Sequence, residues 1–191
     1  YVLQVHQILK IINRQKLIIL MYHGFSDKEH TGVENYLGLH IEKTIFKNQL
    51  QYLKNNYNVI SLAEAIKVIK AKRELPPYSL VITMDDGYKS NYTLAYPILR
   101  GLELPATIFL TTAFTNNHKY LWVDRLEFAI NNTKEIRLDI EFNNQKYHYN
   151  LNDEKQKLLC LQELKFILKR EGIKLREKIV TEVEIKLNIE L

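Results

Sequence analysis

The hydrophobic positions of this 191-residue chain follow two different patterns, one before and one after about residue 134. In the first part, nearly continuous apolar runs occur at residues 17–22, 79–84 and 105–110. Runs without polar alternation are typical of strands that are buried on both faces in a parallel sheet. Because segments with helical spacing separate these runs, the first part predicts alternating strands and helices, and therefore an α/β fold.

Helices are expected between the strands. Apolar side chains recur every three or four residues over 42–56, which predicts an amphipathic helix. Ser61 begins a capping box, and the helix that it opens is expected to turn its isoleucines inward. A further helix is predicted over 88–100, and Pro97 should bend or interrupt it because proline removes an intrahelical hydrogen bond.

From residue 135 the pattern changes to strict alternation of apolar and polar positions. Two alternating stretches flank Asn143-Asn144, a pair of residues typical of tight turns. This predicts an antiparallel β-hairpin over 135–151, followed by a helix from about Asp153 to Glu171. The end of the chain is ambiguous, because its apolar positions fit either a helix or a strand.

The second apolar run ends in Asp85-Asp86-Gly87. Parallel sheets carry their chemistry at the carboxyl ends of the strands, where such residues would lie. Two adjacent carboxylates repel each other unless a cation or a shared proton relieves them. Since successive residues leaving a strand point in different directions, one carboxylate could bind a metal while the other faces water or substrate. The alternative is an ordinary polar turn that closes the strand.

Three motifs, in order and spacing, resemble the polysaccharide deacetylases, the NodB-homology family of carbohydrate esterases. They are Leu20-Met21-Tyr22-His23-Gly24, Thr83-Met84-Asp85-Asp86-Gly87 and Pro105-Ala106-Thr107-Ile108-Phe109-Leu110. The middle motif corresponds to the family's T-F-D-D-G. Residues 121–126 are similar to a helix of a subgroup associated with surface-polysaccharide gene clusters. The resemblance covers about residues 17–130.

For the fold, the resemblance implies a partial, irregular (β/α) barrel with a β-hairpin and helices at the C-terminus. Residues 1–133 would form the N-terminal part of the deacetylase-like domain. Residues 134–191 would be a hairpin and helical insertion or subdomain, cut short at the C-terminus. A partial barrel would leave an unpaired strand edge and an uncovered apolar interior.

For the chemistry, the resemblance implies a metal-dependent hydrolase that removes N-acetyl or O-acetyl groups from a polysaccharide or oligosaccharide. Asp85 would be the general base, and Asp86 would be a ligand of a divalent metal, with zinc as the expected ion. His23 would line the same site, although a strand-end histidine bonded to the backbone is the alternative.

The chain departs from the family at the metal. In the family, the second aspartate shares the metal with two histidines of an H-[ST]-x-x-H-like motif, and no two histidines of this sequence lie four or five residues apart. His118 and His148 are the remaining candidates for substitute ligands. Zinc sites use three or four protein ligands, so we expect the metal to be incompletely coordinated in this chain. Two hypotheses stay open: a deacetylase whose sequence is incomplete, and a non-catalytic, sugar-binding remnant.

Composition and short motifs limit the partners, the location and the alternative enzyme classes that the sequence allows. The net charge of +5 is spread along the sequence without a basic stripe, so nucleic acid is not an expected partner. The partner that the resemblance implies is a carbohydrate substrate. No apolar run approaches the roughly 18 residues of a transmembrane helix, and no signal peptide is visible. The location stays unknown, and both the cytoplasm and the cell envelope remain open. The single Cys160 excludes an internal disulfide. A phosphatase with a D-x-D-G site is excluded because Gly87 stands two residues after Asp85. The sequence does not specify the oligomeric state.

Overall fold

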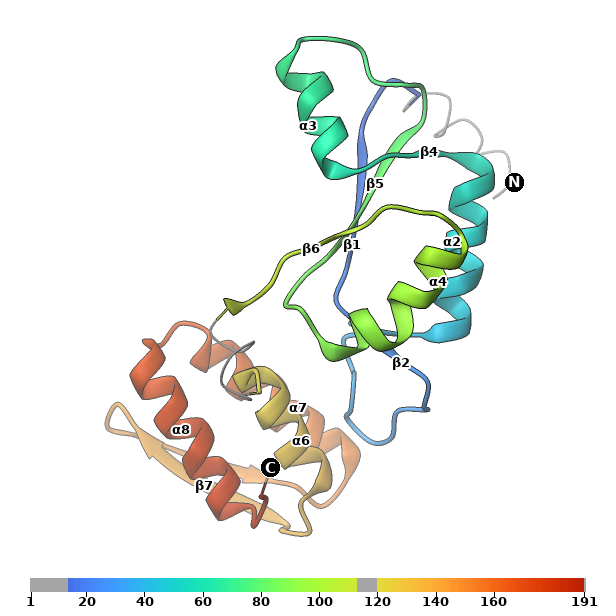
Figure 1. Ribbon diagram of the computed structural model, residues 1–191. Coiled ribbons are helices and arrows are strands. Elements are labelled where there is room, and N and C mark those ends of the chain that lie inside the picture. The colour runs from blue at the N-terminus through green and yellow to red at the C-terminus, as the bar shows by residue number, and fades with distance from the viewer. Residues whose placement is uncertain (1–13, 113–119, 191) are drawn as a thin grey trace, which may run out of the picture. The chain divides into compact units, whose positions relative to one another are not determined.

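The computed structural model describes residues 14–112 and 120–190 (Figure 1). These residues form two compact units. The first contains residues 14–29 and 38–112, and the second contains residues 30–37 and 120–190. The two units are described separately below.

The first unit is built on a parallel sheet around β5 (Ser79–Met84). β1 (Ile18–Tyr22) pairs along one edge of β5, with Ile18 opposite Leu80 and Tyr22 opposite Met84. On the other edge, β4 (Asn58–Val59) pairs with the start of β5 and β6 (Thr107–Ile108) with its end. The prediction that the three apolar runs lie in one parallel sheet is confirmed. Every residue of β5 is buried, as a central parallel strand requires.

One face of this sheet packs against α2 (Lys43–Asn56) and α4 (Tyr96–Gly101) (Figure 1). α2 begins where the sequence predicted, because the side chain of Glu42 accepts hydrogen bonds from the first backbone N–H groups of the helix. Its Phe46 and Leu50 are fully buried against the strands. This packing gives the first unit its main hydrophobic core.

Among the described residues, the opposite face of the sheet is covered at its start alone, by α3 (Leu62–Lys70). Ser61 caps this helix as predicted, since its hydroxyl accepts from the Glu64 N–H at 3.1 Å. The inward placement of the isoleucines is wrong: Ile66 is 43% exposed and Ile69 is 53% exposed. The small Ala65 is the fully buried residue, and it packs with Val81 of β5.

The segment predicted as one bent helix over 88–100 contains two kinds of turn. A π-helical turn, η1 (Asn91–Ala95), precedes α4, and the Tyr96 N–H bonds back to the Asn91 carbonyl. Pro97 lies directly after this wide turn, at the start of α4. Proline has no N–H to donate, so the helix widens where the ordinary bond pattern is interrupted. The sequence did not predict the short parallel pair β2 (Gly24–Ser26) and β3 (His40–Glu42).

The second unit contains a hairpin and three helices. The hairpin is β7 (Arg137–Phe142) with β8 (Gln145–Asn150), and Asn143 and Asn144 between them both have positive φ, 53° and 60°. Two positive φ values define the turn type that matches the twist of paired strands, so the hairpin prediction is confirmed. The helices are α6 (Trp122–Asn132), α7 (Glu154–Leu168) and α8 (Ile173–Lys186). α7 is the predicted helix, capped by Asp153, and α8 resolves the ambiguous end of the chain as a helix.

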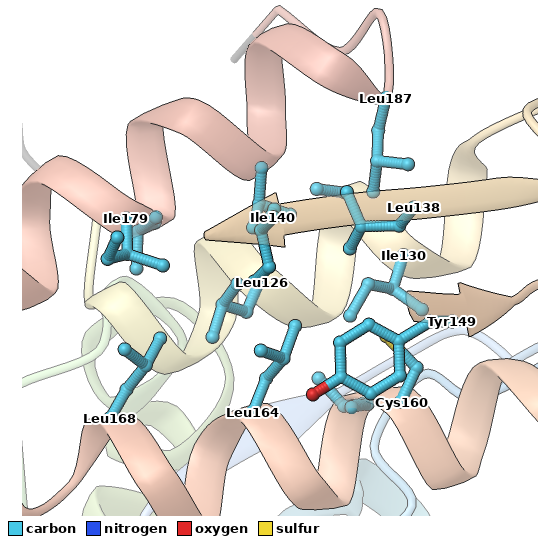
Figure 2. Close-up of a cluster of buried hydrophobic side chains, with 14 of the residues drawn as sticks. Leu126, Ile130, Leu138, Ile140, Tyr149, Cys160, Leu164, Leu168, Ile179 and Leu187 are labelled. Atoms are coloured by element: carbon cyan, nitrogen blue, oxygen red, sulfur yellow. The ribbon is translucent and has the colours of Figure 1, made fainter. Parts of the chain in front are cut away.

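One face of the hairpin and all three helices share the core of the second unit. Figure 2 shows side chains from β7, α6, α7 and α8 meeting in this core, with the Tyr149 hydroxyl pointing toward α7. Burial of Cys160 in this core raises the pKa of its thiol to about 12, as expected of a structural cysteine. In the part of the chain that the structure describes, no helix is long and apolar enough to cross a bilayer.

The segment 30–37 lies between β2 and β3 in the sequence but belongs to the second unit. Val33 is 3% exposed within the second core. Its N–H donates to Asn131 Oδ1 at 2.8 Å, and the Asn35 N–H donates to Glu127 Oε1 at 2.6 Å. Two residues of α6 thus hold this segment in place.

Candidate active site

The two aspartates lie at the carboxyl end of the parallel sheet. The Asp85 N–H donates to the Tyr22 carbonyl at 2.9 Å, so the turn after β5 is joined to the end of β1. On the other side, the Thr111 N–H donates to the Asp86 carbonyl at 3.4 Å. The ends of the three strands therefore lie at one edge of the sheet, as the sequence predicted.

The turn that carries the aspartates has an unusual backbone. Asp86 has φ 69° and Gly87 has φ 73°. Aspartate is among the few non-glycine residues that enter this region readily. At Gly87 an added Cβ would also lie 2.6 Å from Leu110 Cδ2, so the Leu110 side chain would have to move. The sequence Asp-Gly thus suits the positive φ angles of the turn, independently of any chemistry.

Asp85 and Asp86 line an open pocket of about 460 Å³ within the first unit. The other lining residues are mostly apolar: Ile19, Met21, Leu62, Thr83, Phe109, Leu110 and Thr111. Met21 is 61% exposed and Phe109 is 51% exposed, so this face of the sheet is open beside the carboxylates. The uncovered apolar face agrees with what a partial barrel would show, while the barrel itself stays a prediction.

Thr111 is a member of the pocket that the sequence analysis did not select. Its hydroxyl lies 3.4 Å from Asp86 Oδ1, and its backbone also bonds to Asp86. Thr111 directly follows the third apolar run. Residues that follow the strands of a parallel sheet commonly take part in its functional site. Thr111 therefore fixes the second aspartate from the neighbouring strand.

His23 follows β1 directly and is half-buried. It comes one residue after Tyr22, which pairs with Met84, so it lies at the same sheet edge as Asp85. It does not belong to the lining of the 460 Å³ pocket. Its role as a site-lining residue stays a prediction.

Several residues after the aspartates fix the strand next to His23. The Ser90 hydroxyl accepts a hydrogen bond from the Phe25 N–H at 3.0 Å. The ring of Tyr88 meets the ring of His40 edge to face at 4.8 Å between centroids. The same His40 ring fills the space where Gly24 would otherwise carry a Cβ. Residues 88–90 thus brace the β2–β3 pair, a role that no local sequence pattern indicated.

The described residues do not fit a divalent metal centre by themselves. Among residues 14–112 and 120–190, no group of three or more His, Cys, Asp or Glu side chains lies close enough to hold an ion. His148 lies on the hairpin of the second unit, with Nδ1 2.6 Å from Asp139 Oδ1. His118 lies outside the described residues. The described residues therefore do not complete a metal site around Asp86.

Paired carboxylates where a parallel strand ends, beside an open pocket, are typical of a ligand-binding or active site in an α/β unit. The sequence model of the family described as "Polysaccharide deacetylase" matches residues 72–159, the segment that contains both aspartates. The resemblance seen in the sequence is confirmed, because residues 72–159 match the model of the polysaccharide deacetylase family.

The chain is also similar to individual proteins. YxkH of Bacillus subtilis (strain 168) is 33% identical over 96 residues, which are 50% of this chain and 32% of the relative. The poly-beta-1,6-N-acetyl-D-glucosamine N-deacetylase of Escherichia coli (strain K12) is 33% identical over 67 residues, 35% of this chain and 10% of that protein. The solved structure of IcaB from Ammonifex degensii is 24% identical, with a TM-score of 0.46, and covers 58% of this chain and 47% of that chain. The matched regions thus span about a third of the length of YxkH and about a tenth of the E. coli protein.

Proposed function

We propose that this protein acts as a metal-dependent hydrolase that removes N-acetyl groups from a polysaccharide or oligosaccharide, breaking carbon–nitrogen bonds other than peptide bonds. The observation that carries the proposal is the Asp85-Asp86-Gly87 turn at the carboxyl end of β5, inside the segment that matches the deacetylase family. The name of the E. coli relative supports N-acetylglucosamine polymers as the substrate class.

In this proposal Asp85 is the general base. Its carboxylate lines the open pocket, where it can accept a proton from the water that attacks the acetyl carbonyl. The apolar wall formed by Met21 and Phe109 lowers the polarity beside that carboxylate. His23, at the same sheet edge, would contact the substrate.

Asp86 is the proposed ligand of the divalent metal, with zinc as the expected ion. The Thr111 hydroxyl, 3.4 Å from Asp86 Oδ1, would orient the carboxylate. A zinc site needs three or four protein ligands, and no group of three or more possible ligands lies together among the described residues. The proposal therefore requires further ligands from outside the described residues.

A second candidate function is a non-catalytic, sugar-binding domain. The absence of a three-ligand group among residues 14–112 and 120–190 favours it. It keeps the open pocket as a carbohydrate site without hydrolysis. Metal content and acetate release together separate the two candidates.

The test measures acetate release from a β-1,6-linked N-acetylglucosamine oligomer, together with zinc content by atomic absorption. The activity arm uses the protein as its gene encodes it, and the zinc arm also uses the 191-residue chain, for which we expect weak binding. Asp85→Asn should lower the rate by about 10²–10⁴-fold and keep the zinc, because an amide cannot accept the proton. Asp86→Asn should lose both zinc and activity.

Asp27→Asn, at an exposed position after β2, is the matched control and should change neither quantity. If Asp85→Asn retains the wild-type rate, the general-base role is wrong. If the protein with full zinc occupancy releases no acetate, the sugar-binding candidate is favoured instead.

A further inference from the structure

The second unit has a pocket of its own, of about 380 Å³, on the hairpin. Its lining comes from the residues where β7 begins and β8 ends: Ile136, Arg137, His148, Tyr149, Asn150 and Asn152. No group in this pocket takes part in the proposed hydrolysis. Every lining residue lies within one described unit, so the pocket is defined without reference to the first unit.

The polar side chains of this pocket stand in cross-strand register on the outer face of the hairpin. Arg137 is opposite Asn150, and Asp139 is opposite His148. Arg137 Nε donates to Asp139 Oδ1 at 3.1 Å, and His148 Nδ1 lies 2.6 Å from the same oxygen. Asp139 thus orients both neighbours, and these hydrogen bonds, chiefly that with His148, lower the pKa of its carboxyl.

The charges at the pocket indicate what kind of ligand it would take. The positive charge of Arg137 is balanced by Asp139 at 3.0 Å, so the rim has little net charge to attract a phosphate. The remaining polar side chains are His148, bonded to Asp139, and the amides of Asn150 and Asn152, which carry both donors and acceptors. Asn150 Oδ1 accepts one hydrogen bond from the Asn152 N–H at 3.0 Å. A neutral ligand with many hydroxyl or amide groups could pair with these donors and acceptors, and it needs no net charge at the rim.

The pocket also has an apolar contact. Ile136 is 65% exposed at its edge, a large fraction for a side chain of this size. The Tyr149 hydroxyl is directed into the protein core instead, toward α7 (Figure 2), and it is buried. An exposed aliphatic side chain beside amides and a guanidinium can contact the C–H face of a sugar ring or an acetyl methyl group while its polar groups are hydrogen-bonded.

We propose that this hairpin pocket is an accessory subsite for an N-acetylated oligosaccharide. The substrate class rests on the proposed function, whereas the pocket does not use Asp85 or Asp86. Such a subsite would hold a polymer at a second point, which raises its effective concentration at the catalytic pocket.

The experiment is an NMR titration of the ¹⁵N-labelled 191-residue chain with a β-1,6-linked N-acetylglucosamine pentamer, with EDTA present so that no metal contributes. We expect amide shifts at 136–137 and 148–152. Arg137→Ala and Asn152→Ala should each weaken the binding by about threefold to tenfold, the effect of one hydrogen bond. Lys146→Ala is the matched control, because Lys146 lies on the same outer face, opposite Glu141 and away from the pocket, and should leave the affinity unchanged.

The residue-specific shifts separate this proposal from the proposed function. Asp85→Asn should leave the hairpin shifts unchanged, and a protein without hydrolytic activity would still show them. Shifts confined to residues around Asp85, no shift at about 10 mM pentamer, or an unchanged affinity in Arg137→Ala would each overturn the subsite. Tighter binding of inorganic phosphate at the same amides would overturn its assignment to a neutral sugar.

Discussion

Arg125 of α6 is the residue whose replacement should most weaken the second unit. Its guanidinium donates to Glu184 Oε1 at 2.7 Å, to Glu177 Oε2 at 2.7 Å and to Thr181 Oγ1 at 3.0 Å. Glu184 is 9% exposed, so its carboxylate is nearly removed from water. The hydrogen bonds with Glu184 are the main cause that raises the pKa of Arg125, which stays charged. A single side chain of α6 thus binds three residues of α8.

Arg125→Met should therefore leave the Glu184 carboxylate buried without its partner. Breaking one side of a buried ion pair costs about 3–5 kcal/mol, compared with less than about 1 kcal/mol for an exposed pair. The double variant Arg125→Met/Glu184→Met should recover most of this loss, because apolar side chains of similar size can replace a buried pair. Lys186→Met is the control, since it breaks an ion pair with Glu182 whose members are 43% and 30% exposed, together with an exposed hydrogen bond to the Asp139 carbonyl.

The assay is urea unfolding followed by tryptophan fluorescence. Trp122 is the single tryptophan of the sequence and lies at the start of α6, so the signal reports the second unit. Its ring also lies 5.0 Å from the guanidinium of Arg176, which makes its environment sensitive to the position of α8. A loss below about 1 kcal/mol in Arg125→Met, or a double variant no more stable than the single one, would refute the buried-pair argument.

Two further predictions concern other parts of the chain. Gly24→Ala should push the His40 ring off Tyr88 and weaken the β2–β3 pairing, seen as a shift of the His40 ring protons; Gly101→Ala, where no atom lies within 4 Å of the added Cβ, should not. The pKa of the Cys160 thiol is raised from 9.0 to about 12, so the second unit should lose stability between pH 9 and pH 12, by up to about 1.4 kcal/mol per pH unit. The loss should be smaller in Cys160→Ala, and identical pH profiles for the two proteins would contradict this.

The sign of the Cys160 effect follows from the direction of its shift. Burial favours the neutral thiol, so the folded state releases its proton at a higher pH than the unfolded chain does. The stabilisation is complete below pH 9 and is lost as the pH rises toward 12.

Local sequence patterns predicted the elements whose conformation depends mainly on residues adjacent in the sequence. The continuous apolar run before Asp85 is typical of a central parallel strand, and it forms one. Asn143-Asn144 are typical of a tight hairpin turn, and they form one. The end of the chain was ambiguous because alternation over 183–191 competes with helical spacing. The structure decides for the helix, since Ile179, Val180 and Val183 are buried together.

Features that depend on distant residues could not be predicted. The isoleucines of α3 are exposed because that helix packs on only a small part of the sheet. The spacing of apolar residues does not show how much of the sheet a helix covers. Thr111 joins Asp86 only because two strands are neighbours in the sheet. Conversely, the segment 121–126 that suggested a family subgroup has a structural explanation, because Trp122 and Arg125 both contact α8.

The placement of segment 30–37 has a consequence for folding kinetics. Val33 completes the core of the second unit, yet the helix that receives it begins at Trp122, and the Val33–Asn131 hydrogen bond spans 98 positions in the sequence. During synthesis, at roughly 5–20 residues per second, Val33 would wait several seconds for α6. Contacts of such long range also slow folding, because the loop between them must close first. A fragment beginning at residue 116 would have a gap in its core at the Val33 position. The second unit should therefore fold late, because its core needs both residues 30–37, which are synthesised early, and α6, which is synthesised much later.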